Sequence, residues 1–208
     1  MDNQEKNDTY SSIAASSEGV YKEKGSRFLA FAYPVTSEHE VKTLLDKARK
    51  DYYDARHHCY AYRIGINGDI WRVNDDGEPS STAGRPIYSQ ILSKGLSDIL
   101  IVVVRYFGGT KLGVPGLIRA YKSAAADAIA NSRIVEKTAS EMFEAVFDYA
   151  ATDKVMRALK DMGTAPLSYT VGYECRITAR VRLSGTDKFR KRMEEAEARV
   201  SRLQDCEA

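Results

Sequence analysis

The chain has 208 residues, of which 43% are hydrophobic, and a formal net charge of +2 from 31 basic and 29 acidic residues. This composition is typical of a globular protein with a packed core, and it excludes a wholly disordered chain. The near balance of charges disfavours strong nonspecific DNA binding, which usually needs a clear basic excess.

Neither a membrane span nor a secretion signal is predicted. The longest apolar run, residues 99–104, is far shorter than the ~20 residues that cross a bilayer. Residues 1–9 are polar and lack the apolar centre of a signal peptide. Cys59, Cys175 and Cys206 are too few and too scattered for a disulfide framework or a zinc site. We therefore expect a cytoplasmic protein with reduced thiols, no membrane contact and no cofactor.

The first secondary-structure elements are predicted from residue types and from the spacing of apolar residues. Residues 1–19 are rich in Ser, Asn and Asp, and we predict a flexible tail. Residues 21–35 are apolar at both alternating sets of positions, as in a strand covered on both faces. Thr36 or Ser37 can cap a helix that runs to about Asp51. A strand pair, 58–64 and 69–74, then flanks Asn67-Gly68, a strong hairpin signal.

Residues 75–84 have no apolar periodicity and are predicted to form a long polar loop, which is often functional. A helix from Arg85 or Pro86 to Lys94 closes it. A buried strand over 98–106 then enters a glycine-rich turn, which leads into a helix over 117–132. We assign residues 20–135 to one domain.

The pattern changes at residue 136, and residues 136–208 are assigned to a second domain. Their predicted order is βαββαβ, which is typical of a ferredoxin-like module. The whole chain is therefore predicted to be an α+β protein of two domains. The expected elements are a strand over 139–149, a helix over 152–162, a strand pair over 166–183, a helix over 187–198 and a strand over 199–206.

Two neighbouring histidines begin the strand near residue 58. Successive side chains on a strand point to opposite faces, so His57 and His58 cannot both reach one metal ion without a bulge. We predict no metal site. Either histidine could instead serve as a general base or hydrogen-bond to a substrate, or both could be structural.

The polar loop carries Asp75, Asp76 and Glu78. Clustered carboxylates can perform acid–base chemistry or hold Mg²⁺, although the same residues also form solvated turns. The hydroxyls of residues 80–82 and the free N–H groups at the following helix start favour an anion. Thr82 and Arg85 are therefore candidate anion contacts.

The glycine-rich turn, residues 107–116, lies between a strand and a helix, an arrangement in which backbone N–H groups can cradle phosphate. It matches neither common nucleotide-binding fingerprint, and a tight turn with positive φ is the alternative. Arginine beside aromatic residues is typical both of single-stranded nucleic-acid sites and of protein interfaces. The candidate anion, nucleic-acid or partner-binding residues are Arg56, Thr82, Arg85, Arg105, Tyr106, Gly108, Gly109, Lys111, Gly113, Arg119 and Tyr121.

Three stretches, residues 54–59, 74–86 and 102–121, together resemble the IMPACT family in its bacterial YigZ-type branch. The resemblance implies an N-terminal βαβ domain like elongation factor G domain IV, a small-subunit ribosomal protein and the GHMP kinases. It implies a C-terminal domain like elongation factor G domain V. Eukaryotic relatives regulate translation under amino-acid stress through protein partners, and they carry a further N-terminal domain that we expect this chain to lack.

Three functional hypotheses remain open at this stage. The first is a non-enzymatic, translation-associated regulator that binds RNA, the ribosome or a translation factor through its N-terminal domain. The second is an enzyme acting on a phosphorylated or anionic small molecule, with His57 or His58 as base and Asp75, Asp76 or Glu78 as acid or Mg²⁺ ligand. The third is a protein-interaction module without RNA binding.

Overall fold

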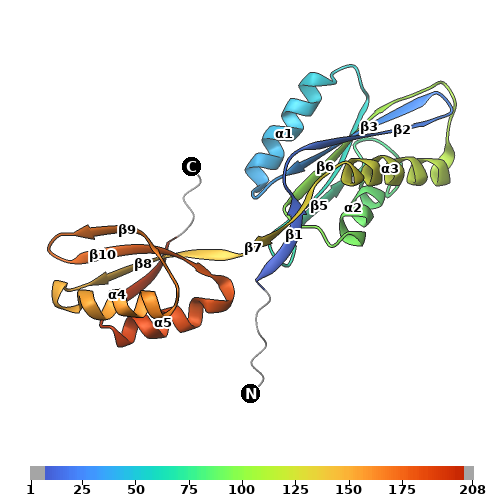
Figure 1. Cartoon of the computed structure of the whole chain (residues 1–208). Helices are drawn as coiled ribbons and strands as arrows, with labels where there is room; N and C mark the ends of the chain where they lie inside the picture. The colour runs from blue at the N-terminus through green and yellow to red at the C-terminus, as the bar shows by residue number, and fades with distance from the viewer. Residues whose placement is uncertain (1–7, 204–208) are drawn as a thin grey trace. The chain divides into compact units, whose positions relative to one another are not determined.

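The structure, a computed structural model, describes residues 8–203. It has an N-terminal domain, Tyr10–Lys137, and a C-terminal domain of residues 138–203 with Asp8 and Thr9 (Figure 1). The first seven residues of the predicted tail, and residues 204–206 of the predicted last strand, lie outside the described residues. No helix within 8–203 is long and apolar enough to cross a membrane.

The N-terminal domain is built on a five-stranded sheet in the order β2-β3-β6-β4-β5, with all neighbours antiparallel. The central strand β6 is buried along nearly its whole length, which explains its continuous apolar sequence. The strands are β2 (Ser17–Glu23), β3 (Ser26–Pro34), β4 (His57–Ile64), β5 (Ile70–Asn74) and β6 (Ile99–Tyr106).

Helices cover both faces of this sheet (Figure 1). α1 (Glu38–Asp51) packs on one face and begins at a capping box in which Ser37 and Glu40 each bond the other's backbone N–H. α2 (Gly84–Ser93) and α3 (Gly113–Ala130) pack on the other face. α3 approaches β2 closely, because a Cβ added to Gly19 would lie 2.2 Å from the backbone N of Ala128.

Two sequence predictions for the first 35 residues are wrong. The segment predicted as a tail forms β1 (Thr9–Ile13), which pairs with β7 (Ile134–Thr138), and the start of β2. Ile13 is buried, and the Tyr10 hydroxyl donates a 2.5 Å hydrogen bond to Asp98, so this polar segment is held by a few specific contacts. The strand predicted over 21–35 is a hairpin, because Lys24 and Gly25 both adopt positive φ and reverse the chain.

The C-terminal domain has the predicted order βαββαβ and a four-stranded antiparallel sheet, β11-β8-β10-β9. Its two helices cover one face, over a core that includes Phe143, Ile177 and Phe189 (Figure 1). The ferredoxin-like topology and the α+β class are therefore confirmed. The elements are β8 (Ser140–Phe147), η1 (Tyr149–Ala151), α4 (Thr152–Asp161), β9 (Pro166–Val171), β10 (Cys175–Arg182), η2 (Leu183–Gly185), α5 (Thr186–Glu195) and β11 (Arg199–Leu203).

Candidate functional site

The chemistry-bearing residues of the N-terminal domain gather at one end of its sheet. There the β2–β3 turn, the end of β6 and the start of β4 lie side by side. The strand register places Lys22, Arg27 and Tyr106 in one row across β2, β3 and β6. The adjacent row, Phe28, Arg105 and His57, points to the opposite face, which α2 and α3 cover.

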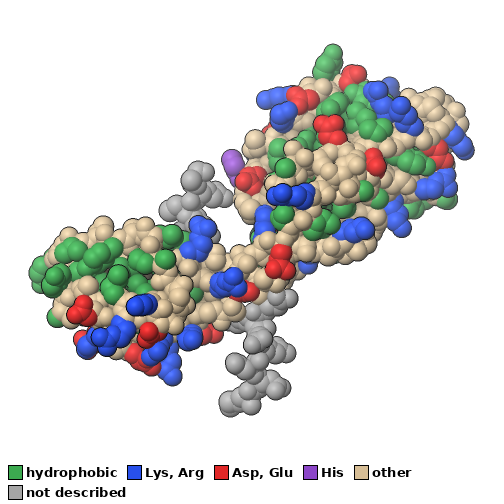
Figure 2. Space-filling view, viewed as in Figure 1, with side chains coloured by type: hydrophobic (Ala, Val, Ile, Leu, Met, Phe, Trp, Pro, Cys, Tyr) green, Lys and Arg blue, Asp and Glu red, His purple; other side chains and the backbone are tan. Residues whose placement is uncertain are grey.

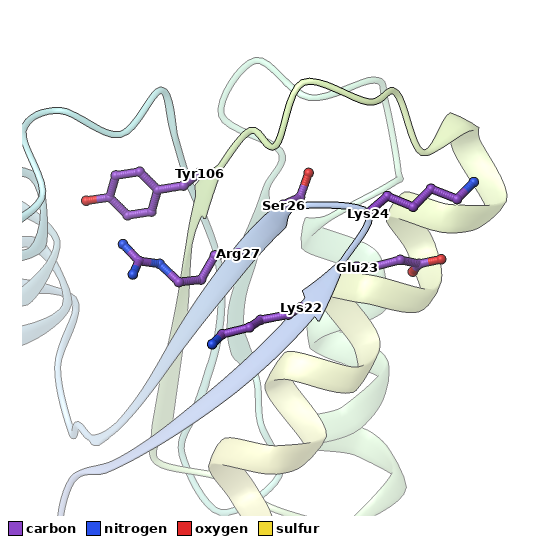
Figure 3. Close-up of a pocket in the computed structure, with 7 residues that line it drawn as sticks. Lys22, Glu23, Lys24, Ser26, Arg27 and Tyr106 are labelled. Carbon is purple, nitrogen blue, oxygen red and sulfur yellow. The ribbon is translucent and has the colours of Figure 1, made fainter.

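The first row borders a surface hollow of about 530 Å³, lined by residues 22–27 and Tyr106. The Arg27 guanidinium lies 4.8 Å from the centre of the Tyr106 ring, a cation–π contact. Figure 3 shows Lys22 and Arg27 on the same side as Tyr106, with Glu23 and Lys24 directed toward α3. Glu23 is paired with Arg119 on α3 at 2.5 Å, so the carboxylate nearest this hollow is already neutralised.

A second hollow, of about 560 Å³, lies next to the first and shares Tyr106 with it. It is lined by residues 54–57 and 105–107. Arg56 is exposed and has no carboxylate partner among the described residues, whereas Asp54 accepts a 2.7 Å hydrogen bond from the Tyr106 hydroxyl. We call the accessible cationic and aromatic residues around the two hollows the basic rim: Lys22, Lys24, Arg27, Arg56, Tyr106 and Phe107.

A buried polar network lies beneath the rim. Arg105 Nη1 and the Tyr121 hydroxyl donate to the same Glu78 oxygen, at 2.5 and 2.8 Å, and Cys59 lies 3.3 Å from the Tyr121 hydroxyl. Burial raises the pKa of both Cys59 and Tyr121, so both stay neutral near pH 7. Arg105 is 7% exposed, and its Nε has no hydrogen-bond partner among the described residues.

The acidic loop uses its carboxylates to hold itself together. One oxygen of Asp75 accepts the N–H groups of Ala83 and Gly84, at 3.0 and 2.8 Å, and its other oxygen accepts that of Ser81 at 2.8 Å. The start of α2, predicted to attract an external anion, is therefore already capped by Asp75. Thr82, predicted to contact an anion, is buried and donates its hydroxyl to Pro79 O.

The two histidines point to opposite faces of the sheet, as strand geometry predicts. His58 is buried, and its Nε2 donates to Tyr52 O at 3.1 Å; burial holds the pKa of His58 below its ordinary value. His57 Nδ1 donates to Asp76 O at 2.8 Å, and His57 lines the second hollow. Asp76 also accepts the backbone N–H of His58 at 2.7 Å. Of the candidate catalytic side chains, only His57 borders either of these two hollows.

The remaining predicted residues divide into three groups. Tyr121, a predicted contact residue, is fully buried and donates its hydroxyl to Glu78. Arg85 and Lys111 are exposed without an ion-pair partner in the described chain, but neither lines the two hollows. The glycines shape the backbone: Gly109 and Gly113 have positive φ, and a Cβ on Gly108 would lie 1.9 Å from the backbone of Gly25.

The hairpin cations Lys22, Lys24 and Arg27 are missing from the residues predicted as a site. They were missed because residues 21–35 read as one continuous strand, on which these side chains would be spread along a sheet surface. The dipeptide Lys24-Gly25 is the available signal, since a glycine between two charged stretches marks a turn. A turn at these two residues places Lys22 opposite Arg27 on the neighbouring strand.

Comparisons with known proteins agree with the resemblance noted in the sequence. The family model for the Impact N-terminal domain matches residues 24–129. The IMPACT family member YvyE of Bacillus subtilis is 38% identical over 65% of this chain and 63% of its own length. The IMPACT family member YigZ of Escherichia coli is 37% identical over 55% of this chain and 57% of its own length. The chain thus spans less than two thirds of the length of these relatives.

A solved structure titled as a hypothetical protein superposes with a TM-score of 0.71 at 24% identity, covering 95% of this chain and 98% of its own. That likeness extends the shared fold over both domains. The family model covers every residue of the rim except Lys22, and it covers the whole of the network beneath the rim. The chain belongs to the IMPACT family and is a member of its bacterial YigZ-type branch.

Proposed function

We propose that this protein is a non-enzymatic, translation-associated regulator in the cytoplasm that binds RNA of the translation machinery through the basic rim. The observation that carries the proposal is the set of exposed cations Lys22, Lys24, Arg27 and Arg56 around two adjoining hollows. No ion pair with a carboxylate occupies any of the four within the described residues. The link to translation rests on membership of the IMPACT family, whose eukaryotic members regulate translation.

The rim has the chemistry that unpaired RNA requires. Cations neutralise phosphates, and aromatic rings stack on bases that have left a helix. Tyr106 is held in place by Arg27 and Asp54, while Phe107 is 57% exposed. Beneath them lies Arg105, which lines the second hollow and adds a positive charge there, although its Nε is buried without a hydrogen-bond partner among the described residues.

The enzyme hypothesis receives less support from the same geometry. Asp75, Asp76 and Glu78 all accept hydrogen bonds from the protein itself, and Glu78 is in addition neutralised by Arg105. His57 would therefore act without a carboxylate that is free to work with it. For this reason the proposal assigns the hollows to binding and not to catalysis.

Co-sedimentation with ribosomes from lysate, at low and high salt, tests the proposal. The variant Arg27→Glu/Arg56→Glu reverses two exposed charges, and the matched control Lys42→Glu/Lys94→Glu reverses two exposed charges that line neither hollow. We expect the rim variant to bind at least about tenfold more weakly and the control to bind like the parent. The slope of log affinity against log salt should shrink by about 0.7–0.9 for each phosphate that the variant no longer neutralises.

Three results would count against the proposal. Association that survives RNase treatment would instead support contact with a ribosomal protein or translation factor. Free protein under every salt condition, or equal binding by the rim variant and the control, would remove the rim from the function.

A further inference from the structure

The C-terminal domain has a hollow of its own, of about 520 Å³, at the end of its sheet. The hollow forms where β10 extends beyond the end of its neighbour β9. The pairing of β9 with β10 stops at Pro166 and Ala179, while β10 stays paired with β8 as far as Arg182. The edge of residues 180–182 that faces away from β8 therefore has no neighbouring strand among the described residues. The turn after α4 and the first residues of α5 wall off this space.

Three cations line this hollow: Arg180, Arg182 and Lys188. None of the described residues that line it is acidic. None of the three has an ion-pair partner within 8–203. Figure 2 shows Lys, Arg, Asp and Glu side chains interspersed on the visible face of this domain. Of the nine cations within residues 138–203 that lie outside the hollow, five are paired with carboxylates. The pairs are Lys154 with Glu197, Arg176 with Glu144, Arg192 with Asp161 and Glu195, Arg199 with Glu174, and Arg202 with Glu141. The other four, Arg157, Lys160, Arg190 and Lys191, have no ion pair within 8–203, and neither has any of the three cations that line the hollow.

The rest of the lining is mixed. Met162, Leu167 and Phe189 supply apolar surface, and Leu167 is 60% exposed. Thr164 brings a hydroxyl next to Gly163, whose positive φ turns the chain out of α4. A cavity of several hundred cubic ångströms with both cations and apolar residues in its lining is of the kind that holds a small ligand.

One carboxylate, that of Asp8, lies beside this lining. Ser184, which lines the hollow, donates its hydroxyl to Asp8 at 2.6 Å. Arg180, Arg182 and Lys188 form no ion pair with Asp8 or with any other carboxylate within 8–203, so they are available to an anion from outside the chain.

We infer that this hollow binds the phosphate group of a nucleoside monophosphate. Two arginines can each offer paired N–H donors to phosphate oxygens, and Lys188 adds a third positive charge. The apolar wall would take the less polar part of the nucleotide. The same chemistry is available from a free nucleotide and from the 5′-phosphate at the end of an RNA strand. The inference does not depend on the basic rim, because every residue that lines the hollow belongs to the C-terminal domain.

Isothermal titration calorimetry on the full chain tests the inference with AMP, adenosine, inorganic phosphate, and a pentauridylate with and without a 5′-phosphate. AMP should bind at least about tenfold more tightly than adenosine, and inorganic phosphate should compete with it. Arg180→Ala/Arg182→Ala should lose at least about tenfold in affinity. The control Lys160→Ala/Lys191→Ala removes two exposed lysines of α4 and α5 outside the hollow and should bind AMP like the parent.

The two ligand sources give different results. Binding of AMP identifies a free nucleotide, whereas binding of the 5′-phosphorylated strand alone identifies an RNA end. If the double-arginine variant does not fold, Lys188→Glu, a single exposed change, should give the same loss. Failure of every phosphorylated probe to bind, or unchanged binding by these variants, would overturn the inference. The rim variant Arg27→Glu/Arg56→Glu should bind AMP normally, so this test and the ribosome test can fail separately.

Discussion

The polar loop at residues 75–83 and the basic rim lie in the same domain and are both rich in charge, but they use it in opposite ways. In the loop, Asp75 and Glu78 are satisfied by groups of the protein itself. Around the rim, Arg56 and Lys22 have no such partner in the described chain. A charged side chain that is paired within the fold contributes to stability, and one that is left unpaired is available to a binding partner. Substitutions in the two regions should therefore separate stability from binding.

The largest loss of stability is expected for Glu78→Ala. Arg105 would remain buried without its carboxylate, and an uncompensated buried charge costs about 3–5 kcal/mol. Urea unfolding should report this loss, and the double variant Glu78→Ala/Arg105→Met should recover much of it, because both charges are then gone. A loss below about 1 kcal/mol would show that Arg105 reaches water once Glu78 is absent.

A smaller loss is expected for Asp75→Ala. The substitution removes three acceptor contacts to backbone N–H groups, two of them at the start of α2, where Ala83 offers no capping side chain. The expected cost is about 2 kcal/mol by thermal or urea unfolding. Asp75→Asn keeps one carbonyl oxygen and should lose less. Equal losses for Ala and Asn would instead mean that the negative charge, facing the helix start, matters more than the hydrogen bonds.

The pH dependence of stability that His58 contributes gives a third test of the comparison. Its folded-state pKa lies below its unfolded value because burial disfavours the charged ring. Between these two pKa values the unfolded chain binds more protons, so the free energy of unfolding rises with pH in that window and falls as pH drops below about 6.5. Asp76 and Arg49, which face the ring, stay in place in His58→Gln, so their contribution cancels in the comparison. The parent should lose stability relative to this variant as pH falls through that window, and a constant difference would contradict the prediction.

Residue patterns predict most of the elements of both domains, because period and capping act locally. Ser37, one of the two predicted caps, is the N-cap of α1, and β6 is buried on both faces as its apolar run predicts. The strand parity of His57 and His58 likewise follows from the sequence. In the C-terminal domain the alternation of buried and exposed residues along β10 marks a sheet covered on one face.

The features that the sequence does not predict depend on contacts between segments that are distant along the chain. Nothing local to Asp75 indicates that its oxygens will meet the N–H groups of Ala83 and Gly84, so the loop reads as a site for an external ion. Tyr121 lies next to exposed α3 residues in sequence, yet it faces Glu78 in the core. Residues 9–13 have no apolar pattern that would predict a strand. Their strand, β1, is held instead by its pairing with β7 and by the hydrogen bond from Tyr10 to Asp98.

The smallest effect on stability is expected for the rim variant Arg27→Glu/Arg56→Glu. Both side chains are exposed and neither has a carboxylate partner in the described residues, so the charge reversal by itself should change the unfolding free energy by no more than about 0.5 kcal/mol per site. The variant also removes the cation–π interaction of Arg27 with Tyr106, which at an exposed site contributes about 0.5–1 kcal/mol at most. Arg56→Glu alone should therefore be the more neutral change. A rim variant that unfolds like Glu78→Ala would show that the rim is structural, because loss of ribosome binding would then follow from loss of fold. A variant that stays folded while binding falls places the function in the charges that the fold leaves unpaired.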